Sequence, residues 1–262
     1  MASDVEVTTE GRVATVTLNR PEAMNAIDNG MRRNLLSAFD EIARSPDLRA
    51  VILTGACKAF CSGADLKSAA ANPDTSLRRT ARTLLHDFQP LLETIGRMDK
   101  PVIAAVNGAA VGVGMSLALA CDLLVMAENA YLMSPFVGIG LIPDGGLAWF
   151  LARRIGYARA FEALVDCQKL GAARCVELGI ANRAVADASL AEAAFKWAGE
   201  LAGRAPIAMA LTKRAARLAL SSSMTDALTM EAELQTICAA TEDAKEAIAA
   251  FRNKRTPDFH GR

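Results

Sequence analysis

The sequence predicts an α/β fold, a largely parallel β-sheet covered by helices and followed by a helical C-terminal region. Two observations support this prediction. Short apolar runs closed by glycine, AVILTG at 50–55 and PVIAAVNG at 101–108, are typical of strands buried on both faces of a parallel sheet. Stretches with helical spacing of apolar residues separate such runs, and only helical patterns follow residue 187.

The first two thirds of the chain alternate between strand and helix patterns. Residues 12–18 (RVATVTL) alternate apolar and polar side chains and end at an Asn-Arg-Pro turn, which predicts a strand. Residues 28–44 carry apolar side chains at helical spacing, and residues 76–99 have a similar pattern. The run CDLLVMA at 121–127 predicts a further buried strand.

The remaining part of the chain is helical in pattern and rich in alanine and leucine. After a first helical stretch, Ser223 with Asp226 matches a capping box at the start of the next helix. Residues 242–255 form a last helical pattern. We therefore divide the chain into a core, residues 1–187, and a helical C-terminal region, residues 188–262.

Composition excludes several classes of protein. The 262 residues carry 29 acidic and 29 basic side chains, so the chain has no bulk charge for nucleic acid. The longest apolar run, Val111–Met126, is interrupted by glycines, a serine and an aspartate, which argues against a membrane span. Six cysteines and two histidines lack metal-ligand spacing, and the N-terminus lacks the pattern of a signal peptide. We expect a cytoplasmic protein with reduced thiols, no metal, and no nucleic-acid or membrane partner.

Two glycine-containing segments directly follow buried strand runs. They are KAFCSGADL at 58–66 and NGAAVGVG at 107–114, and neither fits a phosphate loop or a dinucleotide-binding turn. A helix that begins after such a turn exposes unsatisfied N–H groups, and two converging helix ends bind an oxyanion or a phosphate. The residues alone favour a plainer explanation, in which the glycines only allow tight corners between strand and helix.

Five motifs, in order along nearly the whole chain, resemble the enoyl-CoA hydratase/isomerase family, or crotonase superfamily. They are NRPEAMNAI (19–27), AFCSGADL (59–66), KPVIAAVNGAAVGVGMSLALACDL (100–123), GIGLIPDGG (138–146) and FRNKRTPDF (251–259). The resemblance implies a crotonase-like spiral of ββα units with a helical C-terminal trimerisation region. It also implies an acyl-CoA thioester substrate, assembly as a trimer or a dimer of trimers, and no cofactor beyond the coenzyme A of the substrate.

The resemblance further implies an oxyanion hole made of two backbone amides. By motif position, the donors are the amides of Ala64 and Val113. Many family members have glycine at the second position, and valine keeps the amide while narrowing the pocket. One such donor contributes about 3–4 kcal/mol to stabilising a transition state.

The acid–base residue decides which reaction the resemblance implies. Family hydratases use two glutamates, and the matching positions here are Ser116 and Phe136, neither of which can act as a general base. Asp144 is the remaining acid, at a place where an aspartate shuttles a proton in several isomerase branches. An apolar site would raise its pKa toward a useful value. A helix N-cap at Asp144 is the structural alternative, and capping would lower that pKa.

Substrate contacts are also implied by motif position. The residues concerned are Arg20, Ala23, Ala64, Asp65, Leu66, Lys67, Val113, Phe136, Lys254 and Phe259, the last two on a site that in some members belongs to a neighbouring subunit. A solvated surface role is the alternative for Arg20, and we expect Asp65 and Asp122 to act as structural caps.

The sequence therefore predicts an enoyl-CoA isomerase that uses Asp144 as its proton shuttle. Three alternatives stay open: an enoyl-CoA hydratase, an acyl-CoA-binding protein without turnover, and an aryl-CoA dehalogenase. The dehalogenase would use Asp144 as a nucleophile with a tryptophan and a histidine, but Phe136 occupies the tryptophan place and His86 lies only near the histidine place.

Overall fold

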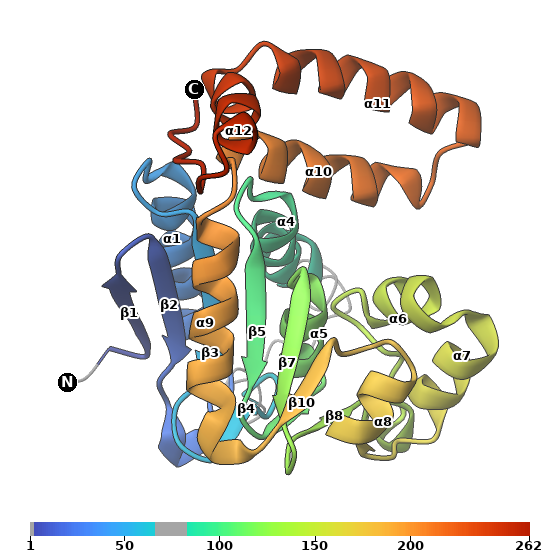
Figure 1. The fold of residues 1–262 in the computed structure, drawn as a ribbon. Helices are drawn as coiled ribbons and strands as arrows, with labels where there is room; N and C mark the ends of the chain where they lie inside the picture. Colours follow the sequence, from blue (N-terminus) through green and yellow to red (C-terminus); the bar gives the residue numbers. More distant parts are fainter. Residues whose placement is uncertain (1–2, 66–82) are drawn as a thin grey trace.

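The computed structural model describes residues 3–65 and 83–262 (Figure 1). Within these residues the larger sheet has six strands in the order β1–β2–β3–β5–β7–β10, and every neighbouring pair except β1–β2 is parallel. The strands are β1 (Val5–Glu10), β2 (Val13–Leu18), β3 (Ala50–Gly55), β5 (Val102–Val106), β7 (Leu123–Ala127) and β10 (Arg183–Val185). The prediction of a largely parallel sheet is confirmed, and β1 adds an antiparallel edge that the sequence did not reveal.

A smaller sheet runs in the order β4–β6–β8–β9. Its strands are β4 (Ala59–Cys61), β6 (Ala109–Val111), β8 (Tyr131–Met133) and β9 (Leu170–Gly171). Each of the first three follows a long strand of the larger sheet, and β6 leads directly into helix α5 (Val113–Ala120). These repeats confirm the spiral of ββα units that the motifs implied.

Helix α1 (Asn29–Arg44) illustrates how local sequence determines these elements. The carboxylate of Asp28 caps it by accepting a hydrogen bond from the amide of Met31 at 2.8 Å. One helix face is apolar and buried, and it includes Met31, Leu35, Phe39 and Ile42. Each such side chain contributes about 1.5–3 kcal/mol on burial. The helix predicted over residues 28–44 is confirmed.

Helices cover both faces of the larger sheet (Figure 1). On one face, helix α4 (Gln89–Arg97) packs against both α1 and α5. Helix α9 (Leu190–Ala202) contacts β2, β3, β5 and β7 on the other face. The predicted helix over 76–99 corresponds to a π-helical turn, η2 (Leu84–Phe88), followed by α4; residues 76–82 lie outside the described residues.

The predicted division after residue 187 assigned α9 to the helical C-terminal region. The structure instead packs α9 on the sheet, where Leu190, Ala194 and Ala198 are buried. Because the alanine side chains at 194 and 198 allow the helix to lie close to the strands, α9 belongs structurally with the core.

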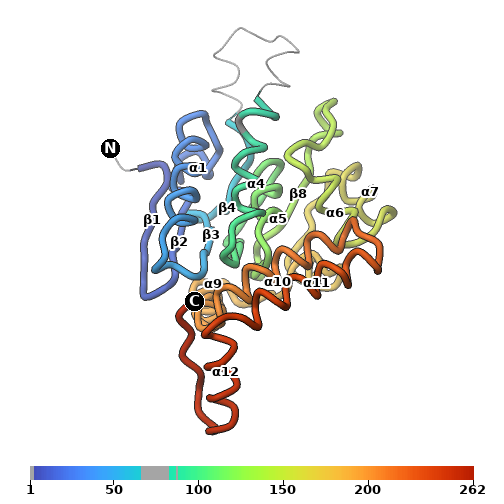
Figure 2. The backbone as a smooth tube through the Cα atoms, turned by 90° about the horizontal axis from the view of Figure 1, so that it is seen from above, coloured from blue at the N-terminus to red at the C-terminus, as the bar shows by residue number. Residues whose placement is uncertain are grey.

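The helices that lie beyond the amino ends of the strands are α10 (Pro206–Ala219), α11 (Met224–Ala239) and α12 (Glu242–Arg252) (Figures 1 and 2). Helices α10 and α11 run side by side. The predicted cap at Ser223 is confirmed, since its hydroxyl accepts a hydrogen bond from the amide of Asp226 at 3.1 Å. None of the helices in the described part of the chain combines the length and apolar character needed to cross a bilayer.

Shorter elements complete the fold. They are α6 (Leu147–Ile155), α7 (Tyr157–Val165), α8 (Ala172–Glu177) and the 3-10 turns η1 (Pro21–Ala23), η3 (Val137–Ile139) and η4 (Asp187–Ser189). Helices α6 and α7 pack against each other at one side of the molecule, and α6 also contacts α5.

Candidate active site

The amide of Ala64 is oriented by a short parallel bridge. Ile27 donates its amide to the carbonyl of Gly63 at 2.8 Å and accepts from the amide of Asp65 at 2.9 Å. In such a bridge the residue between the two partners directs its own N–H to the opposite side. The amide of Ala64 therefore points away from Ile27. Gly63 makes the turn possible, because its φ of +108° is one that residues with a side chain rarely adopt.

The amide of Val113 lies in the first turn of α5. The N-cap residue, Gly112, has a φ of +55° and provides no side-chain cap, while its own amide donates to the carbonyl of Met133 at 3.0 Å. The first amides of a helix have no acceptor within the helix and lie at the positive end of its dipole. Val113 thus presents a main-chain donor with favourable electrostatics, and its side chain is buried.

Glycines bring these two segments into contact. A Cβ atom on Gly63 would lie 3.1 Å from the carbonyl oxygen of Val111, and one on Gly114 would lie 2.2 Å from that of Cys61. Burial raises the pKa of the Cys61 thiol to about 12, so this cysteine stays protonated and offers no thiolate nucleophile. The structure therefore joins the segment of Ala64 to that of Val113, as the motifs implied.

Cations surround the opposite end of α5. Arg154 donates to the carbonyls of Leu119 and Cys121 at 2.7 and 3.2 Å, and Arg217 donates to the carbonyl of Ala120 at 3.2 Å. Burial lowers the pKa of Arg154 to about 10, a value that still keeps it charged near neutral pH. Positive charge at a helix C-terminus complements the dipole, so these residues stabilise the helix that presents Val113.

Asp122 links this end of α5 to the C-terminal helices. Its carboxylate accepts a hydrogen bond from the amide of Val102 at 2.9 Å and forms ion pairs with Lys213 at 2.7 Å and Arg217 at 2.9 Å. The predicted structural role of Asp122 is confirmed, although it caps a strand rather than a helix. No sequence pattern indicated its cationic partners, which come from about a hundred residues away.

Asp144 does not cap a helix. The N-cap of α6 is Gly146, with a φ of +77°, and it has no side-chain cap; only the main-chain carbonyl of Asp144 accepts, from the amide of Leu147 at 3.2 Å. The Oδ1 atom of Asp144 is buried and has no hydrogen-bond partner among the described residues. Burial raises the pKa of this carboxyl above its ordinary value. The capping alternative is therefore wrong.

Asp144 belongs to a segment that lies on the first turn of α5. The hydroxyl of Ser116, a fully buried residue, lies 3.4 Å from the carbonyl oxygen of Asp144. Phe136, also buried, packs beside Gly112, since a Cβ there would lie 3.5 Å from its Cζ atom. The structure thus gathers Asp144, Phe136 and the amide of Val113 around the N-terminus of α5.

Arg20 is held by protein groups near Ala64. Its guanidinium donates to the carbonyl of Ala26 at 2.7 Å and pairs with Asp28 and Asp65, each at 3.2 Å, and its side chain is 16% exposed. The solvated alternative is wrong. Asp65 is an ion-pair partner of Arg20, and its role as a cap stays a prediction. The neighbouring Ala23 is half-buried and its carbonyl accepts from the hydroxyl of Ser62 at 3.3 Å. A phosphate contact by Arg20 stays a prediction.

Two asparagines that the sequence analysis did not identify hold the segment leading to Ala64. Asn25, fully buried, donates to the carbonyls of Ala56 and Ala59 at 3.0 and 2.7 Å. Asn107 donates to the carbonyl of Cys57 at 3.0 Å and accepts from the amide of Gly55 at 3.2 Å. Their positions within the Met-Asn-Ala and Asn-Gly turns were the available signal, because asparagine commonly satisfies the main chain of turns.

Among the implied substrate residues that the structure describes, Lys254 and Phe259 are not brought to this site. Leu66 and Lys67 lie outside the described residues. Phe259 lies at the amino end of β3, where its carbonyl accepts a hydrogen bond from the guanidinium of Arg49 at 2.7 Å. The exposed Lys254 lies in the same C-terminal tail, just after the C-cap residue of α12. Ala64 instead follows the carboxyl ends of β3 and β4, so the two regions lie at opposite edges of the sheet (Figure 1).

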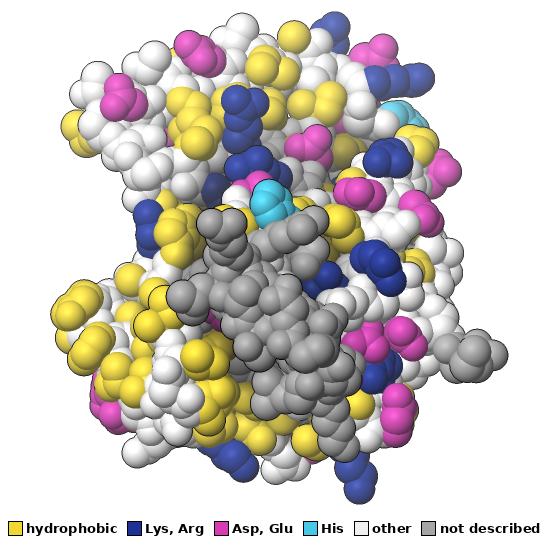
Figure 3. Space-filling view, turned by 180° about the vertical axis from the view of Figure 1, so that it is seen from behind, with side chains coloured by type: hydrophobic (Ala, Val, Ile, Leu, Met, Phe, Trp, Pro, Cys, Tyr) yellow, Lys and Arg dark blue, Asp and Glu magenta, His cyan; other side chains and the backbone are white. Residues whose placement is uncertain are grey.

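A surface rich in apolar side chains lies beside the Asp144 segment. Among the exposed residues of η3, α6, α7 and the connection before Asp144 are Ile139, Leu141, Ile142, Tyr157 and Phe161. Figure 3 shows apolar side chains gathered on this side of the molecule. The segment of Asp144 thus lies beside an apolar surface from which a bound partner or substrate would exclude water.

Comparison with known proteins agrees with the geometry. The family model described as enoyl-CoA hydratase/isomerase matches residues 8–262. A probable enoyl-CoA hydratase of Rhodobacter capsulatus is 40% identical over 95% of both chains, and the 1,2-epoxyphenylacetyl-CoA isomerase of Escherichia coli is 34% identical over 97% of both. The crystal structure of an enoyl-CoA hydratase from Polaromonas sp. JS666 has a TM-score of 0.93 at 34% identity, covering 97% of this chain and 99% of that one. The chain therefore belongs to the enoyl-CoA hydratase/isomerase family and is an enzyme of that family.

Proposed function

We propose that the enzyme is an enoyl-CoA isomerase, which moves a double bond of an acyl-CoA thioester. Coenzyme A enters as part of the substrate, and the reaction uses no other cofactor. The observation that carries the proposal is the Oδ1 atom of Asp144, which is buried beside the first turn of α5 and has no hydrogen-bond partner in the described part of the chain. A single carboxylate with a raised pKa suits a group that takes up a proton and then returns it.

In the proposed mechanism the thioester carbonyl accepts hydrogen bonds from the amides of Ala64 and Val113. The carboxylate of Asp144 removes a proton from one carbon of the acyl chain, and the electron pair moves through the conjugated system onto the thioester oxygen. Each amide stabilises this enolate by about 3–4 kcal/mol. Asp144 then returns its proton to a different carbon, the carbonyl reforms, and the carboxylate is regenerated.

Ser116 and Phe136 support isomerisation over hydration. Addition of water by two carboxylates needs one to activate the water and the other to donate a proton. The hydroxyl of Ser116 contacts the main-chain carbonyls of Gly112 and Asp144, and Phe136 carries no ionisable group. Neither side chain can take the place of a second carboxylate.

Hydration is the second candidate function, because the 40%-identical relative bears the name of a probable enoyl-CoA hydratase. Incubation with a 2-enoyl-CoA and quantification of 3-hydroxyacyl-CoA tests this candidate. Brisk hydration would overturn the isomerase assignment. Exchange of substrate α-protons with heavy water, without net turnover, would instead indicate enolisation alone, and absence of exchange would indicate a binding protein.

The central test compares Asp144→Ala with the wild type on a 3-enoyl-CoA. We expect isomerisation to fall by about 10²–10⁴-fold, the usual contribution of a general acid–base residue. Asp47→Ala is the matched control, since it removes an exposed carboxylate just before the amino end of β3. Full isomerase activity in Asp144→Ala would refute the proposed mechanism.

The amide donor at position 113 can be tested directly. Proline lacks the N–H group but is tolerated at the first position of a helix, which is where Val113 lies. Val113→Pro should lower kcat by about 10²–10³-fold, the effect of losing one oxyanion donor. Val113→Ala retains the amide and should keep most of the activity; equal losses in both variants would contradict a main-chain role.

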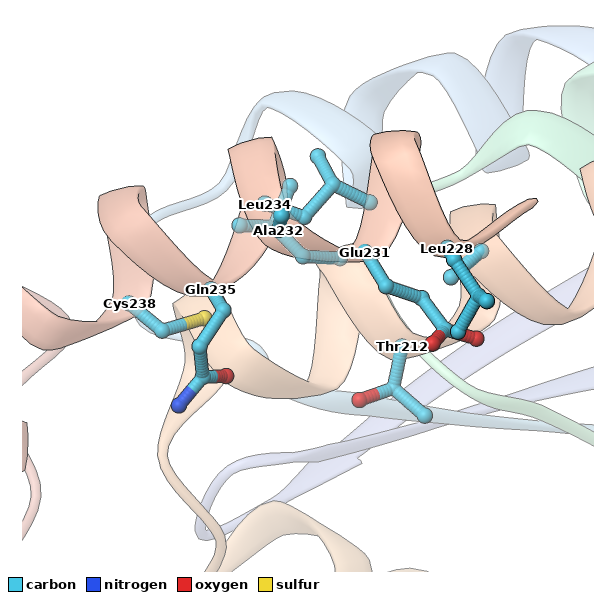
Figure 4. Close-up of a pocket in the computed structure, with 9 residues that line it drawn as sticks. Thr212, Leu228, Glu231, Ala232, Leu234, Gln235 and Cys238 are labelled. Atoms are coloured by element: carbon cyan, nitrogen blue, oxygen red, sulfur yellow. The ribbon is translucent and has the colours of Figure 1, made fainter. Parts of the chain in front are cut away.

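We further infer assembly as a trimer or a dimer of trimers. Met224 and Phe251 are 79% and 86% exposed, and a groove of about 550 Å³ between α10 and α11 is lined by apolar residues such as Leu228 and Leu234 (Figure 4). Assembly would cover these surfaces and could bring Lys254 and Phe259 to the site of a neighbouring subunit. Sedimentation at a monomer mass would contradict this inference.

A further inference from the structure

We propose that Ser116 is a positioning residue that seats the main chain of Asp144 and Gly145 against the first turn of α5. The same seat leaves no room for a longer side chain at position 116, and so it keeps a second carboxylate out of the site. The inference rests on the proposed role of Asp144, and it identifies what fixes that carboxyl and restricts the reaction to proton transfer.

The contacts of Ser116 join two elements. Its side chain is fully buried, and its hydroxyl lies 3.4 Å from the carbonyl oxygen of Gly112, one turn earlier in α5. The hydroxyl also lies 3.4 Å from the carbonyl oxygen of Asp144. One hydroxyl proton serves these two acceptors, so Ser116 satisfies the helix carbonyl and the incoming loop in turn.

The approach of the loop is closer than a side chain would permit. Gly145 has a φ of +59°, and a Cβ atom at this position would lie 2.5 Å from Oγ and 2.9 Å from Cβ of Ser116. Leu92 closes the same space from α4, with its Cδ1 atom 3.9 Å from that Cβ position. Main chain therefore fills the volume into which a glutamate at position 116 would extend.

This packing fixes the carboxyl of the preceding residue. Asp144 is directly bonded to Gly145, so a larger residue at either 116 or 145 moves the segment that carries the carboxyl. A displacement of about 1 Å at a reacting group can lower the rate about 10²-fold. The size of residue 116 thus sets the position of Asp144 and excludes a carboxylate at position 116.

A pair of glycine variants tests the close packing of Gly145 on Ser116. Gly145→Ala and Gly140→Ala both place a side chain at a positive φ, +59° and +76°. Only the first meets Ser116, because no atom of residues 3–65 or 83–262 lies within 4 Å of a Cβ at Gly140. We expect Gly145→Ala to lower kcat for a 3-enoyl-CoA about 10²-fold. We expect Gly140→Ala to leave kcat nearly unchanged.

A second substitution then tests whether Ser116 is the cause. Adding Ser116→Gly to Gly145→Ala removes the atoms in the way, so the double variant should recover at least about 10-fold in kcat with little change in KM. A double variant that is as impaired as, or more impaired than, Gly145→Ala would overturn the proposal.

Substitutions of Ser116 alone complete the test. Ser116→Ala retains the volume without the hydroxyl and should fold; we expect a lower kcat, an unchanged KM and a shifted acid limb of the kcat–pH profile. Ser116→Glu should lose isomerisation and gain no hydration of a 2-enoyl-CoA. Hydration gained by Ser116→Glu with isomerisation retained would overturn the proposal, as would an unaltered kcat and pH profile in Ser116→Ala.

The outcomes distinguish a failure of the positioning role from a failure of the proposed isomerase function on which it rests. Loss of activity in Asp144→Ala together with wild-type behaviour of Ser116→Ala and Gly145→Ala would remove only the positioning role. Full activity in Asp144→Ala would remove the isomerase mechanism, whatever the Ser116 variants do.

Discussion

Gly114 offers a test of how packing supports the main-chain donors. It lies in the first turn of α5, directly after Val113. A Cβ atom on Gly114 would lie 2.2 Å from the carbonyl oxygen and 2.8 Å from the Cβ atom of Cys61. The segment of Cys61 leads to Ala64, so Gly114→Ala pushes apart the two stretches of chain that carry the proposed donors.

The expected magnitude follows from that clash. Ordinary contact begins near 3.4 Å, so α5 and the segment of Cys61 must separate by roughly 1 Å. Misplacing a reacting group by about 1 Å lowers rates about 10²-fold, and losing one donor outright lowers kcat about 10²–10³-fold. Overpacking a core also costs about 1–3 kcal/mol in stability. We therefore expect kcat to fall at least about 10²-fold and the Tm to decrease.

The assay follows isomerisation of a 3-enoyl-CoA well below the Tm of the variant, so that unfolding does not contribute. Gly199→Ala is the matched control, because Gly199 lies within α9 and no atom of the described residues lies within 4 Å of its Cβ position. This control should retain activity and gain about 1 kcal/mol from improved helix propensity. Wild-type kcat and Tm in Gly114→Ala would refute the argument that close packing at this glycine aligns the donors.

Three further predictions concern charge and hydrogen bonding. Because burial raises the pKa of Asp144, the folded state loses stability as the pH rises through the folded pKa and this carboxyl ionises. Asp144→Asn should therefore raise the Tm near pH 7 but not near pH 3. Equal shifts of the Tm at both pH values would contradict this prediction. For the same reason, the kcat for isomerisation should fall as the pH decreases, with a midpoint above the ordinary aspartate pKa of about 3.9. A midpoint at or below that value would count against the prediction. Asp122→Ala leaves the largely buried Lys213 and its neighbour Arg217 without their carboxylate partner. The free energy of unfolding, measured by urea denaturation, should therefore fall by about 3–5 kcal/mol. A loss below about 1 kcal/mol would contradict this prediction.

Side-chain patterns predicted the elements that bury large apolar faces. The runs AVILTG and PVIAAVNG identified β3 and β5 because both faces of these strands are covered. Strand β1 was missed because its burial pattern leaves all but Val5 exposed, and it is held by main-chain pairing with β2. The three-residue strands β4, β6 and β8 are too short to show a period. The division at residue 187 misplaced α9, because helical periodicity says nothing about which surface a helix covers.

The candidate site was predictable only in part. Asp144 was identified as the remaining acid. Whether its side chain caps α6 depends on the backbone conformation of Gly145 and Gly146, which no side-chain pattern reveals. The donors proposed at Ala64 and Val113 are main-chain atoms, so only motif similarity located these two residues. Arg154 and Arg217 support α5 across long sequence separations, and their roles depend on tertiary packing.

The location of the proposed donors in the peptide backbone has an evolutionary consequence. Nearly every codon change at positions 64 and 113 leaves an N–H group in place, so mutation can reshape the surrounding side chains while the anion-binding pair is inherited intact. A new reaction can then arise by changing one or two neighbouring acidic residues, while the main-chain amides proposed to bind the carbonyl stay in place.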